Sequence, residues 1–188
     1  MALIVLEQKM IDIETLSKSI NTLLGNNFII HIEDGRAIPF CFKLAHFHHL
    51  LGLHYLDDMP DIKNAKNKSG LVKKLLKDPR LFSRIQRSSH FEKIRDRIEK
   101  FPIIVDMLIL DRCKIIIDFD KSLLPATSIK SEFLLYKTED YKCYHILGIA
   151  SVKNFYYPET FLVENSKYYV TGQKFLNCTI ERIAFKLK

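Results

Sequence analysis

The chain has no tryptophan, and its 188 residues include only six glycines, six prolines and four cysteines. So few glycines and prolines exclude a collagen-like repeat and argue against low-complexity disorder. No apolar run approaches the roughly 20 residues that a membrane-spanning helix requires, so we expect no membrane partner. The apolar residues 1–6 are interrupted by Glu7 and follow no positively charged stretch, so they do not predict a signal peptide.

Cysteine pairs and several enzyme motifs are also missing. Without close spacing, the cysteines predict neither a zinc site nor a disulfide framework, and they favour a reducing cytoplasm. Their positions are Cys41, Cys113, Cys143 and Cys178. A Walker loop, a GxGxxG motif and a GxSxG motif do not occur. Nucleotide hydrolases, dinucleotide-dependent enzymes and α/β-hydrolases therefore have no support.

The sequence does have an excess of positive charge, and it lies in one segment. Residues 60–100, called the basic insert below, hold 13 basic and 5 acidic residues, a net charge of +8. Clustered cations bind polyanions because neutralised phosphates release condensed counterions, although a solvated helix surface would explain the same pattern. The residues that we nominate as nucleic-acid-binding are Lys43, Lys73, Lys74, Lys77, Arg80, Arg84 and Arg87.

Hydrophobic spacing predicts the N-terminal elements. Apolar residues recur at intervals of three and four from Leu3 to Leu24, which predicts an amphipathic helix. Gly25 is expected to end that helix with a left-handed cap. Two strands, at residues 28–33 and 37–42, are predicted to flank a hairpin turn at residues 34–36.

The middle of the chain is predicted to be mainly helical, and the end of the chain is predicted to consist mainly of strands. We expect helices at 43–53, 71–76 and 80–101, the last divided by a capping-box pattern at Ser89 and Glu92. A polar loop is expected at 57–69. Strands are expected at 114–119, 132–137, 144–151, 168–170 and 179–186. The predicted fold class is α+β, with an N-terminal helix and hairpin, a basic helical insert and then an antiparallel β-sheet.

The densest cluster of reactive side chains contains His46, His48, His49 and His54. On a helix, His46 and His49 share one face, and histidine exchanges protons near neutral pH. Metal-independent RNA cleavage needs a base for the 2′-OH, an acid for the 5′ oxygen and cations for the phosphorane. A shared metal is the rival interpretation, but the cluster contains no acidic residue and no HExxH motif. We expect at least two of the four histidines to be bystanders.

A second candidate is the run from Phe155 to Phe161, which contains Tyr157, Glu159 and Thr160. A threonine or tyrosine hydroxyl could donate to a scissile phosphate, and the aromatic rings could stack on an unpaired base. A plain sheet turn with packed aromatic side chains explains the same residues.

Two motifs carry a resemblance to a known family. The first has an aromatic residue followed by His-Leu-x-Gly, here Phe47 and His49-Leu50-Leu51-Gly52, after Phe40-Cys41-Phe42-Lys43. The second is Pro158-Glu159-Thr160-Phe161. Over residues 28–186 the chain resembles the fourth group of the phage-type barnase/EndoU/colicin/RelE-like nucleases.

The resemblance implies a ribonuclease of phage or toxin type, with an N-terminal helical part, an antiparallel β-sheet of about four strands and no metal cofactor. Only His49 and Thr160 match motif positions and carry over as catalytic residues. His46 and Tyr157 are catalytic candidates from this sequence alone, because the catalytic residues of such nucleases vary. We expect RNA, and an antitoxin or inhibitor protein, as partners. We expect an N-terminal helix over 1–26 and a nuclease-like α+β domain over 27–188.

The leading functional hypothesis is a metal-independent endoribonuclease that cleaves RNA by 2′-OH transesterification. Two others remain open. One is a non-catalytic nucleic-acid-binding or phage-defence interaction protein with the same fold. The other is a metal-dependent hydrolase that uses the histidine cluster.

Overall fold

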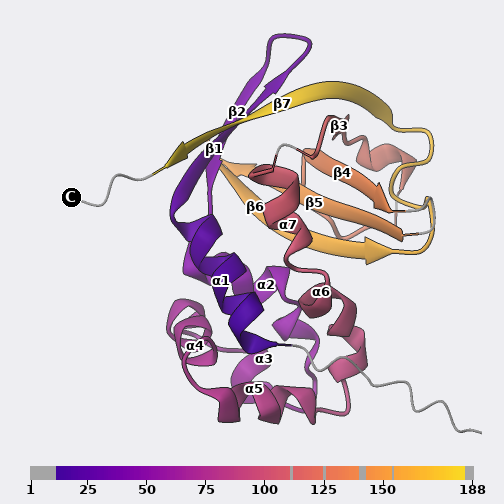
Figure 1. Cartoon of the computed structure of the whole chain (residues 1–188). Helices are drawn as coiled ribbons and strands as arrows, with labels where there is room; N and C mark the ends of the chain where they lie inside the picture. The colour runs from indigo at the N-terminus through magenta and orange to yellow at the C-terminus, as the bar shows by residue number, and fades with distance from the viewer. Residues whose placement is uncertain (1–11, 111, 125, 140–142, 154, 185–188) are drawn as a thin grey trace, which may run out of the picture.

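The computed structural model describes residues 12–110, 112–124, 126–139, 143–153 and 155–184. A β-barrel forms one half of the molecule, and a layer of short helices packs against one end of it (Figure 1). Within the described residues, no helix is both long enough and apolar enough to cross a membrane.

The barrel is closed and mixed. Its strands follow the order β1-β2-β6-β5-β4-β3-β7. All neighbouring strands pair antiparallel except β2 and β6, which pair parallel where Phe40 lies opposite Tyr156. The strands are β1 (Asn26–Ile32), β2 (Ala37–Cys41), β3 (Ile115–Asp118), β4 (Phe133–Glu139), β5 (Cys143–Val152), β6 (Phe155–Glu164) and β7 (Lys174–Ala184).

The predicted antiparallel sheet of about four strands is therefore wrong, although the α+β class is confirmed. The N-terminal hairpin belongs to the barrel, because β2 pairs with β6 and β1 pairs with β7. β6 was missed because Pro158 lacks a backbone donor and is disfavoured inside a sheet. Here the pairing register shifts at that point, because Gly148 and Ile149 of β5 lie opposite Thr160 and Pro158 and leave Glu159 of β6 as the extra residue. Residues 168–170 form a turn rather than the expected strand.

Short helices make up most of the second layer. Figure 1 shows them together below the barrel, with α7 rising along its side. The helices are α1 (Ile13–Leu24), α2 (Leu44–Leu50), α3 (Pro60–Lys63), α4 (Lys68–Leu75), α5 (Pro79–Gln86), α6 (Arg95–Glu99) and α7 (Ile103–Leu108). Single 3₁₀ turns are η1 (Leu53–Tyr55), η2 (Phe91–Lys93) and η3 (Lys121–Leu123).

These helices correct several expected boundaries. The amphipathic helix is confirmed from Ile13 to Leu24, and residues 3–11 of the prediction lie outside the described residues. Asp12 caps its N-terminus by accepting hydrogen bonds from two backbone N–H groups. Gly25 follows the last turn with φ −78°, so the expected left-handed cap is wrong. The helical stretch expected at 80–101 is divided as predicted, into α5, η2 and α6, whereas the expected polar loop contains α3.

A chain of phenylalanine rings joins the two layers. Phe42, next to β2, stacks on Phe47 of α2 at 5.6 Å between ring centroids. Phe47 meets Phe101 at 5.8 Å, and Phe101 meets Phe161 of β6 at 6.1 Å. All four rings are buried, and such aromatic pairs add about 0.5–1.5 kcal/mol each beyond the area that they bury. The rings therefore fix α2 against β6, where the histidine cluster lies.

Candidate active site

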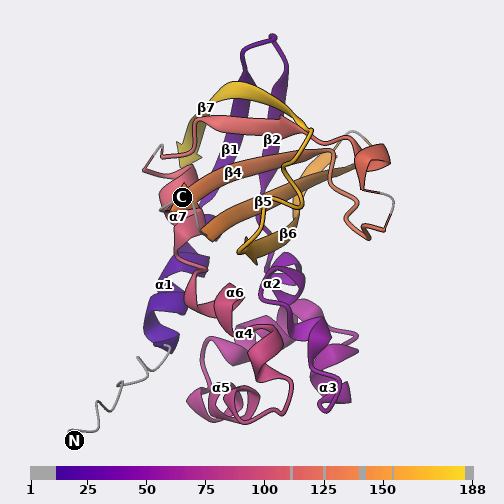
Figure 2. The same cartoon turned by 90° about the vertical axis from the view of Figure 1, so that its right-hand side faces the viewer.

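Helix α2 and the following turn η1 carry the histidine cluster along the end of the barrel that β6 forms. Figure 2 shows α2 directly beneath β6, with α6 beside it. Sequence motifs that are more than 100 residues apart therefore face each other across one junction of helices and strands.

A pocket of about 420 Å³ opens at the first turn of α2. It brings together three residues that the sequence singled out, Lys43, His46 and Tyr157. The rings of His46 and Tyr157 lie 5.7 Å apart between centroids. The remaining lining residues are Cys41, Val152, Lys153, Phe155 and Tyr156.

His46 is held in a defined, uncharged state. Its Nδ1 accepts a hydrogen bond from the backbone N–H of Lys43 at 3.2 Å, which places the proton of the neutral ring on Nε2. Burial lowers the pKa of His46 to about 4, and the positive charge of Lys43 contributes. A neutral imidazole is therefore present at pH 7.

His49 and His54 form a stacked pair. Their rings are 4.0 Å apart between centroids and nearly parallel, at 9°. Burial lowers the pKa of both, that of His54 to about 3, and the pKa of His54 is lowered further by a positive charge on His49. For His49 the carboxylate of Glu159 opposes this shift. Both rings are therefore neutral at pH 7, and His49 is the one with an acidic neighbour.

His48 has a different environment. Its ring is buried, and its Nε2–H donates to the carbonyl oxygen of Ile62 at 2.8 Å. This hydrogen bond ties α2 to α3. His48 is thus a core histidine with a structural contact, as expected for a bystander.

Arg97 of α6 is the cation of this site. Its guanidinium lies 5.1 Å from the centre of the Tyr55 ring. Burial lowers the pKa of Arg97, and Tyr55 and Glu164 partly offset that effect. Its buried Nη1 atom makes no hydrogen bond within the described residues. A buried charge with an unused donor is costly to maintain, so an anion is the natural partner of this group.

Gly52 allows Arg97 to approach the histidines. Its φ is +74°, a conformation that glycine adopts readily. A Cβ atom at this position would lie 2.8 Å from Cγ2 of Ile94 and 3.1 Å from Cδ of Arg97. The His49-Leu50-Leu51-Gly52 motif therefore does two things, since it carries a site histidine and lets α6 close on α2.

Thr160 lies in a small polar group on the barrel. It is 4% exposed and pairs across the sheet with Gly148. A Cβ atom at Gly148 would meet both Thr160 and Ser131, so these two side chains are neighbours. Ser131 donates a hydrogen bond to the Glu159 carboxylate at 2.6 Å. Thr160 is thus linked to the acidic neighbour of His49, and its catalytic role stays a prediction.

The nominated cations of the basic insert lie on α4 and α5 or directly beside them, within the helical layer (Figure 1). Arg84 is paired with Asp61 at 2.8 Å, and Arg87 donates to the carbonyl oxygen of Ser83. The four remaining cations are exposed and are called the α4–α5 face below. They are Lys73, Lys74, Lys77 and Arg80.

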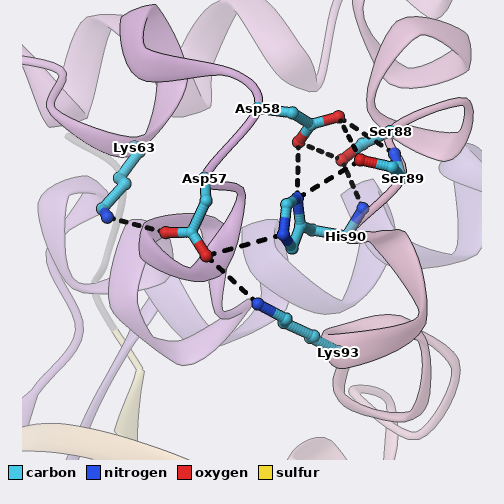
Figure 3. A network of polar contacts seen from close by, with 7 residues as sticks. All are labelled: Asp57, Asp58, Lys63, Ser88, Ser89, His90 and Lys93. Atoms are coloured by element: carbon cyan, nitrogen blue, oxygen red, sulfur yellow. Dashed lines mark hydrogen bonds and ion pairs between the residues drawn. The ribbon is translucent and has the colours of Figure 1, made fainter.

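Sequence analysis missed a polar network that closes the basic insert. Figure 3 shows His90 between two acids, with Nδ1 3.2 Å from Asp58 and Nε2 3.7 Å from Asp57. Asp58 also accepts hydrogen bonds from Ser88 and Ser89, which lowers its pKa. Both serine hydroxyls donate to Asp58, so the network is a clamp between two loops rather than a serine nucleophile with its base.

The residues that sequence reasoning missed are those that other segments bring to the histidines. They are Tyr55, Arg97 and Glu164, of which Arg97 was counted only as one charge of the basic insert. Within the described residues, no group of three or more His, Cys, Asp or Glu side chains could hold a metal ion.

Comparison with protein families gives one match. The model of the phage-Barnase-EndoU-ColicinE5/D-RelE like nuclease4 family matches residues 14–184. No curated protein and no solved structure matches the chain.

Proposed function

The chain belongs to the phage-Barnase-EndoU-ColicinE5/D-RelE like nuclease4 family, and we propose that it is an endoribonuclease that cleaves RNA without a metal ion. The observation that carries the proposal is the neutral His49–His54 stack beside the partly buried guanidinium of Arg97. A proton acceptor next to a cation is the arrangement that attack of a 2′-OH on the adjacent phosphate requires.

We assign the general base to His49. Its lowered pKa keeps the imidazole neutral at pH 7, which is the form that accepts a proton. In the proposed step, His49 takes the proton of the 2′-OH while the 2′ oxygen bonds to phosphorus. Glu159 stabilises the imidazolium that forms, because its carboxylate raises the pKa of His49.

We assign Arg97 to stabilise the negative charge of the phosphorane and Tyr157 to act as the general acid. The Nη1 donor of Arg97, which has no hydrogen-bond partner in the described part of the chain, can bind a phosphate oxygen as negative charge develops. Burial raises the pKa of Tyr157, so its phenol stays protonated and can protonate the departing 5′ oxygen. His46 has the wrong state for this acid role, because its pKa of about 4 leaves it neutral. His46 beside Tyr157 and Thr160 beside Ser131 remain candidates for orienting the phenol and the phosphate.

The test of this function is incubation of the purified protein with total RNA in EDTA. We expect cleavage that leaves 2′,3′-cyclic phosphate ends, because the 2′ oxygen is the nucleophile. Loss of cleavage in EDTA would support the metal-dependent hydrolase. A salt-sensitive gel shift without cleavage would support a non-catalytic binding protein. The toxin role and an antitoxin or inhibitor partner stay predictions.

We further propose that the α4–α5 face binds the RNA backbone. Its four cations are exposed, and α4 packs on α2, so the face belongs to the helices next to the one that carries three of the histidines. Exposed cations without a protein carboxylate partner are available to phosphates.

Changing Lys73, Lys74 and Lys77 to Glu should weaken RNA binding and flatten its salt dependence. Each lost phosphate contact lowers the slope of log K against log salt by about 0.7–0.9, so three contacts change it by about 2. Anisotropy titrations at several salt concentrations measure this slope. The matched control replaces Lys18, Lys167 and Lys174, which are exposed outside the basic insert. Equal slopes for the two triple variants would show that RNA binding depends only on the net charge of the protein, and would contradict binding at the α4–α5 face.

A further inference from the structure

The pocket at the start of α2 has features that the proposed chemistry does not use. Three aromatic side chains line it, and Phe155 among them is 79% exposed. Phe155 also opens β6, directly after the turn that follows β5. Val152, which also lines the pocket, is 54% exposed, and adjoining exposed apolar side chains are typical of a binding surface.

The charges of the pocket select an anion. Lys43 lies on one side, before α2, and Lys153 lies on the other, after β5. No acidic residue is among the described residues that line the pocket. Its ligand should therefore combine a flat apolar part with negative charge. A volume of about 420 Å³ lies within the range of pockets for small organic groups.

We propose that this pocket binds one unpaired nucleobase together with its phosphate, so that the substrate is single-stranded RNA. Aromatic side chains stack on unstacked bases, and lysines neutralise the adjacent phosphate. The RNA part of this inference rests on the proposed function. His46 and Tyr157 belong to the pocket wall, so the bound base lies next to the scissile phosphate. A base-paired duplex cannot present a base to the pocket.

Cys41 supplies a probe that does not depend on cleavage. Its thiol lines the pocket and is partly exposed, whereas Cys113 and Cys178 are buried. We would alkylate the protein with N-ethylmaleimide and quantify each cysteine by peptide mass spectrometry. A 2′-O-methyl oligonucleotide, which has no free 2′-OH and cannot be cleaved, should slow alkylation of Cys41 at least threefold when single-stranded. The same sequence as a blunt duplex should not.

The exposed ring supplies a second measurement. Phe155→Ala should weaken binding of the labelled single strand about 10-fold, the size of effect that loss of one base–aromatic stack produces. Phe175→Ala is the matched control, because Phe175 is 45% exposed on β7. Neither ring belongs to the buried core, so both variants should fold.

The outcomes distinguish failure of the proposed base-binding pocket, called the subsite, from failure of the proposed cleavage activity. Equal protection by duplex and single strand, or equal binding by the two phenylalanine variants, would overturn the subsite, even if RNA is cleaved. Protection of Cys41 and loss of binding in Phe155→Ala would support the subsite, even if RNA in EDTA stays intact and the proposed activity fails. A protein partner in this pocket would leave all nucleic-acid readouts unchanged and would also overturn the proposal.

Discussion

His49→Ala is expected to lower the rate of RNA cleavage about 10²–10⁴-fold, the usual cost of losing a general acid or base. RNA binding should be retained, because the exposed cations lie on α4 and α5. The wild-type rate should fall as pH decreases, since protonated His49 cannot accept a proton. The midpoint of that fall should lie below pH 6.5, the ordinary pKa of histidine, because burial lowers the pKa of His49. Single-turnover rates from pH 4 to 8 measure both effects.

His31→Ala is the matched control. His31 is exposed on β1 and bonds Glu181 of β7 at 2.9 Å. Its replacement should leave cleavage within about twofold of wild type, because a surface pair contributes little. Full specific activity in a well-folded His49→Ala protein would remove His49 from the mechanism. A lower melting temperature with activity in proportion to folded protein would indicate a core role instead.

Arg97→Met is expected to lower cleavage about 10²–10³-fold without lowering the melting temperature. Loss of one donor to developing oxyanion charge has this cost in other enzymes. Stability should be kept or raised, because methionine fills the space of the side-chain stem and removes a buried cation whose Nη1 atom has no hydrogen-bond partner among the described residues. The cleavage rate and the melting temperature should be measured on the same preparation. We expect the rate to fall while the melting temperature does not.

Arg95→Met is the control for Arg97→Met. Arg95 belongs to the same helix, pairs with Glu92 and lies 5.7 Å from the centre of the Phe91 ring. Its loss should leave cleavage unchanged. Arg97→Lys should recover part of the activity, because the charge is restored. If Arg97→Met melts lower and cleaves at the wild-type rate per folded molecule, Arg97 is a packing residue.

Local patterns predicted the local elements well. Gly35 has φ +91° in the expected hairpin turn, and Asp78 and Pro79 open α5. The sequence also placed His46 and His49 on one helix, which the structure confirms, while their catalytic roles stay predictions. These signals were readable because turn chemistry and helical spacing depend on neighbours in the sequence.

The rest depends on contacts that the sequence does not display. The parallel pairing of β2 with β6 joins Phe40 to Tyr156, and no local pattern marks such a pairing. Arg97 has the same sequence signature as the solvated cations around it. Arg97 differs from those cations in its close contact with Gly52, and this contact exists only in the folded chain.

Closure of the barrel has a consequence for how the chain folds. β7 is synthesised after every other strand, yet it pairs with both β1 and β3, so Asn26 must find Ala184. Pairings over such sequence distances carry a large loop-closure entropy and slow folding toward the millisecond-to-second range. Until β7 docks, β1 and β3 present open edges that can capture other strands. A nascent chain therefore cannot complete the barrel that supports β6 against α2 until β7 has left the ribosome, which delays any RNA cleavage until after that point.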